Sequence, residues 1–437
     1  MTTRQALDRT LLLMRDEVDP SVSDEALLGA LRGTTVVLLA NRVNISSHVA
    51  QSAFVTTAML MARSGHRVFL CAPDVALVGA QPPLRAGGMI ERLLEAGTNL
   101  VPGVEIFCGL SRGKADLAIA LGDTPFLGSA RRRIRLNASA WAGQLTSEEH
   151  SSRWSEPTWP IGAMTAASLA AGEAFKIAMQ KLGPFFRNPD RLATTFADTT
   201  EITFAVAPPS TPLSGNLGRF DCISGGAIIN AALYTLARVP TLCALARVIE
   251  PDVGDETNLN RYMLLQHSAV GKSKARDLAD VCREVLSIDS IVRRYDASLH
   301  GSISPLAPSV LVGVDHIPSR WEVQRAGPRW LGIGATSHWS AMASFHQPGI
   351  GCAQCLHPSD DTNDVPIPTV AFVSFWSGLL TAAYLLRHTA GEKMRPCDQQ
   401  IYLTALRPEN PFWAPVPIRE RCPTCGRSCE PQRDVAA

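Results

Sequence analysis

Short apolar runs alternate with longer helical segments along the chain, which is typical of a parallel sheet covered by helices on both faces. The pattern predicts helices over the first 32 residues, with a break at Asp19-Pro20, and apolar helices over residues 47–64 and 161–180. Runs of strand length follow the first helices, at 34–40 (TTVVLLA), 67–71, 115–121 (ADLAIAL) and 133–137. The pattern predicts a doubly wound α/β unit.

The same order of elements recurs in the second half. Strands are predicted at 220–224, 246–250, 309–314 and 330–333, and helices at 228–236 and 370–386. Residues between the halves carry many Pro, Thr and Ser, as a linker would. We therefore expect two Rossmann-like doubly wound domains in tandem, related by a degenerate duplication. The predicted parts are an N-terminal helical segment over 1–32, a first domain over 33–183, a linker over 184–215 and a second domain over 216–437.

Composition narrows the class of protein. A chain of 437 residues with 46% hydrophobic content has room for about two to three packed domains. Forty-one basic and forty acidic residues give a net charge of +1, which argues against broad binding to nucleic acid or anionic membranes. The only apolar run near the start, Leu11 to Met14, is too short for a signal peptide, so we expect a cytoplasmic protein with reduced thiols.

The charge-free stretch 370–386 is at the lower limit of length for a membrane span. Ser374, Ser377, Gly378 and Thr381 interrupt it, so a buried helix is the favoured interpretation.

Two CxxC pairs predict a metal site, at Cys352-Ala-Gln-Cys355 and at Cys422-Pro-Thr-Cys425. Two intervening residues allow both thiolates of a pair to bind one ion, and four thiolates complete a tetrahedral zinc site with no open position. We therefore expect a structural Zn²⁺ that ties the C-terminal tail to the body of the protein. Disulfide pairing is the alternative.

A second set of polar motifs follows the strands of the second half. Glu250 ends the second strand, and the chain continues through Asp252 to Asn258-Leu-Asn-Arg261. A Gly-Lys-Ser-Lys-Ala segment then runs from Gly271 to Ala275, and Asp315 follows a later strand. In this order, with the two CxxC pairs downstream, the motifs over about 215–426 resemble those of the ThiF/MoeB/ubiquitin-activating-enzyme superfamily.

The resemblance implies a nucleotide site for ATP and Mg²⁺. Asp252 would bind the ribose hydroxyls, Asn258 and Arg261 the phosphates, Lys274 the α- and β-phosphate oxygens, and Asp315 the magnesium ion. Arg261, Lys274 and Asp315 would be the catalytic residues, because attack of a carboxylate on a phosphate brings anions together. Singly, each residue also fits a helix cap or a solvated surface position, and it is their order that favours the site.

The phosphate-binding loop departs from the superfamily's Gly-x-Gly-Gly-x-Gly. Here it is Ser224-Gly225-Gly226-Ala-Ile-Ile229, and only Gly226 falls on a superfamily glycine. Gly225 and Gly226 remain as the loop residues expected to contact the nucleotide. Loss of the other glycines puts ATP affinity in doubt, because glycine lets backbone amides approach a phosphate closely.

The first domain lacks these motifs, so we expect it to be a non-catalytic partner that replaces the second subunit of the superfamily's homodimers. The chain would then be an intramolecular pseudo-dimer, with a homodimer of the whole chain left open. Arg4-Gln5 resembles the Ser-Arg-Gln of relatives, which implies that Arg4 reaches the phosphates; a surface arginine is the alternative.

The leading hypothesis is an adenylyltransferase that activates the C-terminal carboxylate of a small ubiquitin-like protein, a sulfur-carrier protein or a precursor peptide. No cysteine lies between Leu356 and Val370, so no obligatory thioester step is expected. The alternatives are an inactive zinc scaffold that binds a peptide or carrier protein and, less well supported, a dinucleotide-dependent oxidoreductase with Glu250 as its ribose-binding acid.

Overall fold

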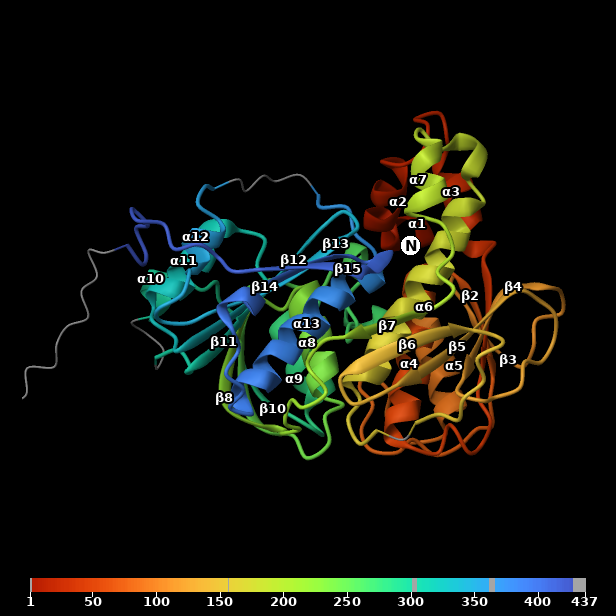
Figure 1. Ribbon diagram of the computed structural model, residues 1–437, viewed down its shortest axis with the longest axis horizontal. Coiled ribbons are helices and arrows are strands. Elements are labelled where there is room, and N and C mark those ends of the chain that lie inside the picture. The colour runs from red at the N-terminus through yellow and green to blue at the C-terminus, as the bar shows by residue number, and fades with distance from the viewer. Residues whose placement is uncertain (1, 156, 301–304, 361–365, 427–437) are drawn as a thin grey trace, which may run out of the picture.

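The computed structural model describes residues 2–155, 157–300, 305–360 and 366–426, which form two sheets with their helices, side by side (Figure 1). The first sheet has the strand order β3-β2-β1-β4-β5-β6-β7, and the second has the order β10-β9-β8-β11-β12-β13-β14-β15. Seven strands of the second sheet follow the order of the first, strand for strand. The predicted fold class, two doubly wound domains in tandem, is confirmed.

The first half contains seven strands, at β1 (Thr35–Leu39), β2 (Arg67–Cys71), β3 (Ile106–Cys108), β4 (Ala115–Leu121), β5 (Ala130–Ala138), β6 (Ala142–Ser147) and β7 (Ile202–Ala205). Its helices are α1 (Thr3–Ala6), α2 (Asp8–Arg15), α3 (Asp24–Arg32), α4 (His48–Arg63), α5 (Met89–Leu100), α6 (Ile161–Gln180), a 3-10 turn at Gly183–Phe185 and α7 (Pro189–Thr194). The range 184–215, predicted as a linker, contains α7 and the edge strand β7. The linker and the domain boundaries stay predictions.

The second half contains eight strands, at β8 (Asn216–Ile223), β9 (Cys243–Ile249), β10 (Ser287–Ile291), β11 (Ser309–Val312), β12 (Trp330–Ser337), β13 (Ser340–His346), β14 (Gln400–Thr404) and β15 (Arg407–Ala414). Its helices are α8 (Ala227–Leu236), α9 (Lys274–Cys282), α10 (Ala297–His300), α11 (Ile317–Arg325), α12 (Ala353–Leu356) and α13 (Ala371–Thr389), with 3-10 turns at Glu256–Asn258, His267–Ala269 and Pro396–Asp398. The antiparallel strands β13, β14 and β15 were not predicted.

The two halves pack through their helices into one continuous core. Helix α13 lies against α8, β12, β13 and the first half's α6. Its residues from 371 to 387 are buried, which explains its apolar sequence as that of a core helix. Among the described helices, none is long and apolar enough to cross a bilayer.

A buried arginine links the halves as well. The Arg63 guanidinium, on α4, is fully buried and donates hydrogen bonds to the carbonyl oxygens of Met263 and Leu265, at 3.3 and 2.6 Å. These carbonyls lie shortly after the Asn-Leu-Asn-Arg motif, so the first half supports the segment that carries it.

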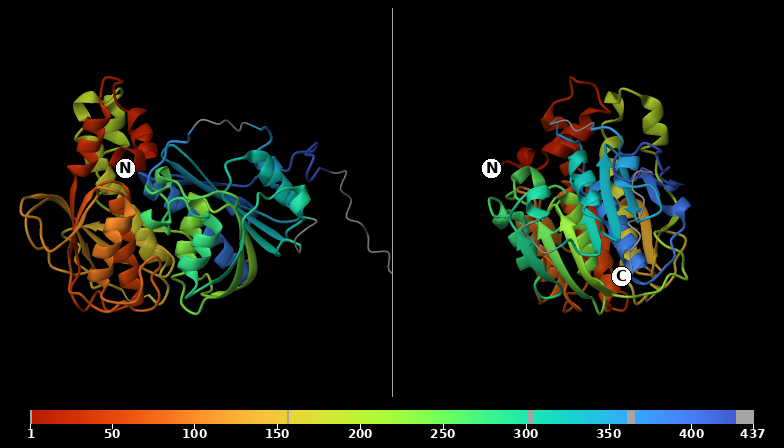
Figure 2. Two further views of the ribbon diagram at one scale, coloured as in Figure 1. Left: turned by 180° about the vertical axis from the view of Figure 1, so that it is seen from behind. Right: turned by 90° about the vertical axis from the view of Figure 1, so that its left-hand side faces the viewer.

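The N-terminal helices lie above the first half, next to the second (Figure 2). Thr10 accepts a hydrogen bond from Asn260 Nδ2 at 2.9 Å, and Trp339 Nε1 donates to Glu17 at 2.7 Å. Residues near the start of the chain therefore come close to the motifs of the second half.

Candidate nucleotide site and metal centre

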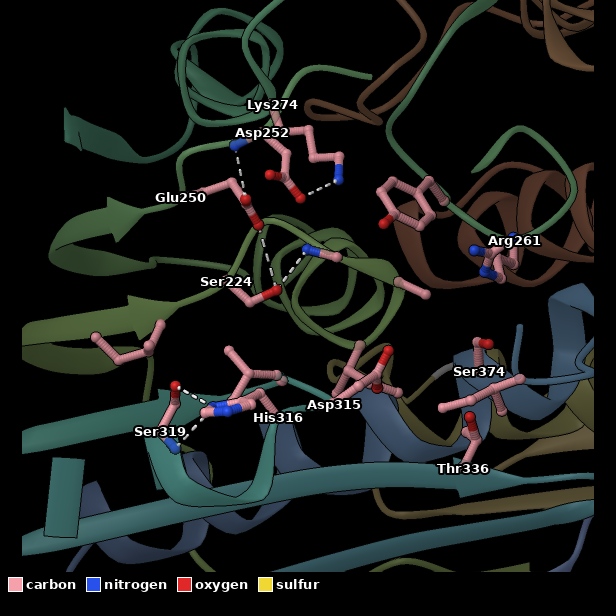
Figure 3. Close-up of a pocket in the computed structure, with 18 of the residues that line it drawn as sticks. Ser224, Glu250, Asp252, Arg261, Lys274, Asp315, His316, Ser319, Thr336 and Ser374 are labelled. Atoms are coloured by element: carbon pink, nitrogen blue, oxygen red, sulfur yellow. Dashed lines mark hydrogen bonds and ion pairs between the residues drawn. The ribbon is translucent and has the colours of Figure 1, made fainter. Parts of the chain in front are cut away.

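A cavity of about 540 Å³ opens at the carboxyl ends of β8, β9 and β11. Strand β8 pairs with β9 on one side and with β11 on the other, so the chain leaves the sheet in opposite directions at this point. Such switch points are where open α/β sheets bind their ligands. The cavity brings together five of the predicted residues, Gly226, Asp252, Arg261, Lys274 and Asp315 (Figure 3).

The loop after β8 is held by its own side chains. Ser224 has a φ of 105°, in the left-handed region that favours glycine, and it stands where the superfamily has its first glycine. Its hydroxyl oxygen accepts a hydrogen bond from Gly226 N at 2.8 Å, and Glu250 Oε2 accepts one from Gly225 N at 2.6 Å. Both amides that we expected to face a phosphate are therefore already paired.

Glu250 is a structural residue of this loop. Its carboxylate is 5% exposed, and its second oxygen accepts a hydrogen bond from Asp252 N at 2.9 Å. A ribose-binding acid needs a free carboxylate, so this geometry opposes the oxidoreductase hypothesis. Asp252 is the more accessible of the two acids, with 65% of its side chain exposed.

Lys274 lies across the cavity mouth from the loop, at the start of α9. Its ammonium contacts Asp252 Oδ2 at 3.2 Å. Burial by itself would lower the pKa of Lys274, but Tyr262, Glu250 and Asp252 outweigh this effect and raise it. The side chain is therefore a fixed positive charge at neutral pH.

Arg261 supplies a second cation on another wall. Its guanidinium donates to Asn260 Oδ1 at 2.9 Å and to the carbonyl oxygen of Thr257. Burial lowers the pKa of the Arg261 guanidinium, yet an arginine stays charged under all ordinary conditions.

Asn258, from the same motif, is not among the residues that line the cavity. Its side-chain oxygen accepts a hydrogen bond from Asp255 N at 3.0 Å, which closes a capping box around the short 3-10 turn. The helix-cap interpretation therefore describes Asn258 better than phosphate contact does.

Asp315 follows β11 on the opposite side of the cavity and is exposed to it. Among the described residues, none donates a hydrogen bond to its carboxylate. The neighbouring His316 is engaged by Ser319, with Nδ1 at 2.8 Å from the hydroxyl, which leaves Asp315 as the free group of this strand end.

Arg4 is not brought to the cavity. It pairs with Asp24 at 2.5 Å and is 65% exposed. Arg9, one helix later, lines the cavity instead, and its buried Nε has no partner among the described residues. The two arginines lie on different helices, which are separated by a break at Leu7, and the sequence pattern did not show which of them turns inward.

The four predicted cysteines converge as well. Their sulfur atoms all lie within 4.8 Å of one another, with Cys352 to Cys422 at 3.5 Å and Cys355 to Cys425 at 3.4 Å. All four are free cysteines, and these separations are longer than the about 2.05 Å of a disulfide bond. A tetrahedron of sulfurs around zinc has edges of about 3.8 Å when each Zn–S bond is about 2.3 Å, so the spacing suits that ion.

The place in the first sheet that corresponds to this cavity, at the end of β4, is filled by side chains of the first half. Asn44 Nδ2 donates to the carbonyl oxygen of Leu121 and to Asp123, both at 2.8 Å, and to Thr124 at 3.0 Å. Asp123 follows β4 as Asp315 follows β11, but here a hydrogen-bonded asparagine holds the carboxylate.

Comparisons with known proteins match different parts of the chain. Residues 35–184 match the family model described as the BilD N-terminal domain, which is about a third of the chain. A curated relative, an uncharacterized protein y4jF of Sinorhizobium fredii, is 25% identical over 235 residues, or 52% of this chain. The match spans only 44% of that protein's length.

Solved structures match more distantly. Escherichia coli MccB, crystallised with SeMet MccA, is 17% identical with a TM-score of 0.40, covering 47% of this chain and 66% of MccB. The microcin C7 biosynthetic enzyme MccB in complex with N-formylated MccA is 15% identical with a TM-score of 0.42, covering 67% and 98%. The two doubly wound sheets, the motifs at the strand ends and the cysteine cluster agree with the chain's resemblance to the ThiF/MoeB/ubiquitin-activating-enzyme superfamily.

Proposed function

We propose that this chain is an ATP-dependent adenylyltransferase that activates a carboxylate, namely the C-terminus of a small ubiquitin-like protein, a sulfur-carrier protein or a peptide. The observation that carries the proposal is the charge pattern of one cavity. Arg9, Arg261 and Lys274 approach it from three separate elements. The carboxylates of Asp252, which pairs with Lys274, and of Asp315 flank them. A nucleoside triphosphate with its magnesium ion needs cations for the phosphates and acids for the ribose and the metal.

In the proposed reaction, a carboxylate oxygen of the substrate attacks the α-phosphorus of ATP. A new P–O bond forms, the bond to the β-phosphate oxygen breaks, and pyrophosphate leaves with that electron pair. Lys274 and Arg261 would neutralise the charge that builds up on the phosphates, and Asp252 would hold the ribose. Asp315 would hold Mg²⁺, which supplies further charge neutralisation when bound; its free, exposed carboxylate fits that ion.

The first half would be a non-catalytic partner, since its own strand ends are filled by the Asn44 hydrogen bonds. The cysteine cluster would hold a structural Zn²⁺, which requires reduced thiols and fits the cytoplasmic location expected from the sequence. The second candidate function, an inactive scaffold for a peptide or carrier protein, is favoured by one observation: the loop amides of Gly225 and Gly226 are already paired.

Thermal unfolding with and without ATP·Mg²⁺ separates these two functions. A ligand that binds only the native state adds about 2.7 kcal/mol of stability at a hundredfold excess over Kd, so an enzyme should show a raised unfolding midpoint. An unchanged midpoint at millimolar ATP·Mg²⁺ would favour the scaffold.

Arg9 and Arg4 offer a matched pair of variants for the cavity. We expect Arg9→Ala to weaken ATP·Mg²⁺ binding by about tenfold to a hundredfold, because a charge-assisted hydrogen bond contributes about 1.5–3 kcal/mol. Arg4→Ala should leave the affinity unchanged, since Arg4 pairs with Asp24 at the surface. Isothermal titration of both variants measures this, and equal losses in the two would contradict the placement of Arg9.

A further inference from the structure

The loop after β8 leaves a gap in the nucleotide site of the proposed function, on which this inference rests. Gly225 N and Gly226 N, the donors that would approach a phosphate, are committed to Glu250 and to the Ser224 hydroxyl. A phosphate seated above the loop therefore needs other hydrogen-bond donors.

Tyr262 lies at that place. It is 6% exposed, it lines the cavity, and its hydroxyl has no hydrogen-bond partner among the described residues. A methyl group built on Gly226 would lie 3.5 Å from the Tyr262 hydroxyl, so the hydroxyl lies directly beside the loop. The hydroxyl opens into the cavity, where a bound ligand can accept its hydrogen bond.

The surroundings of the ring decide which part of a nucleotide the hydroxyl would meet. The Arg261 guanidinium lies 5.4 Å from the ring centroid and the Lys274 ammonium 5.7 Å from it. Figure 3 shows these two cations on either side of the upper cavity. Because both cations already lie close to the ring, the ring is unsuited to stacking on a base. The hydroxyl of Tyr262 therefore lies in a positively charged part of the site.

We propose that the Tyr262 hydroxyl donates a hydrogen bond to a phosphate oxygen of the bound nucleotide, in place of the backbone amides that the loop has committed elsewhere. Tyr262, which directly follows the Asn-Leu-Asn-Arg motif, would then supply the phosphate contact that the two loop amides do not make. The ring also lies close to both cations, so the three groups gather in one part of the cavity.

Tyr262→Phe tests the proposal, because it removes only the hydroxyl and keeps the ring between its two cations. Dissociation constants for ATP·Mg²⁺ and for adenosine should be measured by competition on the full chain. We expect ATP affinity to fall roughly tenfold and adenosine affinity to stay unchanged. Tyr402→Phe, on β14 and outside the cavity lining, is the matched control and should change neither constant.

The outcomes separate this inference from the proposed function. If the wild-type chain binds ATP·Mg²⁺ and the variant binds it equally well, the role of Tyr262 is overturned while the nucleotide site stands. An equal loss for ATP and adenosine would also overturn it, because it would place Tyr262 at the nucleoside end. If the wild-type chain binds no ATP, the proposed function itself fails, and this inference with it.

Discussion

Replacing Asp315 with alanine should lower pyrophosphate release by about two to three orders of magnitude while leaving the fold intact. The expectation follows from the position of the carboxylate, which is exposed in the cavity at the end of β11 and is not paired by any described residue. A side chain that no neighbour needs can be removed at little cost in stability. The loss should therefore appear in the chemistry alone.

Pyrophosphate release with a candidate carboxylate substrate is the direct measurement. The increase in ATP affinity that Mg²⁺ produces is a second readout, which needs no knowledge of the substrate. It should be present in the wild-type chain and absent in Asp315→Ala. Asp123→Ala is the matched control, because Asp123 holds the equivalent place after β4 but accepts a hydrogen bond from Asn44. It should leave both readouts unchanged. Undiminished turnover in Asp315→Ala would contradict the assignment of Asp315 as the magnesium-binding residue.

The sequence predicted the central strands of each sheet and the convergence of the motifs well, for a physical reason. Strands buried on both faces must be continuously apolar, as 34–40 and 115–121 are, and the ends of parallel strands meet at one edge of the sheet. Asp252 and Asp315, 63 residues apart, line one cavity for that reason. The two cysteine pairs converge as well, as their CxxC spacing predicted.

Features that depend on tertiary contacts could not be predicted from the sequence pattern. The antiparallel strands β13 to β15 lie toward one edge of the sheet, and the outermost has a mostly exposed or half-exposed burial pattern without a clean alternation. Arg9 rather than Arg4 enters the cavity, and the two lie on different helices separated by a break at Leu7. Asn258 closes a capping box, and the role of Tyr262 is visible only once the loop amides are seen to be paired.

Replacing Cys422 with serine should remove most of the bound zinc and lower the unfolding midpoint by at least several degrees. Zinc binding to four-ligand peptides contributes about 10–16 kcal/mol, and a hydroxyl is a poor substitute for a thiolate. Zinc content by elemental analysis and a thermal unfolding curve measure both effects. Cys397→Ser is the matched control, because Cys397 is exposed and outside the cluster. A full metal complement in Cys422→Ser would refute the ligand set.

The same variant should also weaken ATP·Mg²⁺ binding, because the cluster is connected to the strand end that carries Asp315. Ala353 N, between two of the ligands, donates to Gln324 on α11 at 3.1 Å. From the same helix, Arg320 contacts His357 at 2.9 Å and donates to the carbonyl oxygen of Val314 at 3.0 and 2.7 Å. Loss of zinc would loosen these contacts and with them the position of the next residue, Asp315. A zinc-free variant that still binds ATP·Mg²⁺ at full affinity would confine the metal to holding the C-terminal tail.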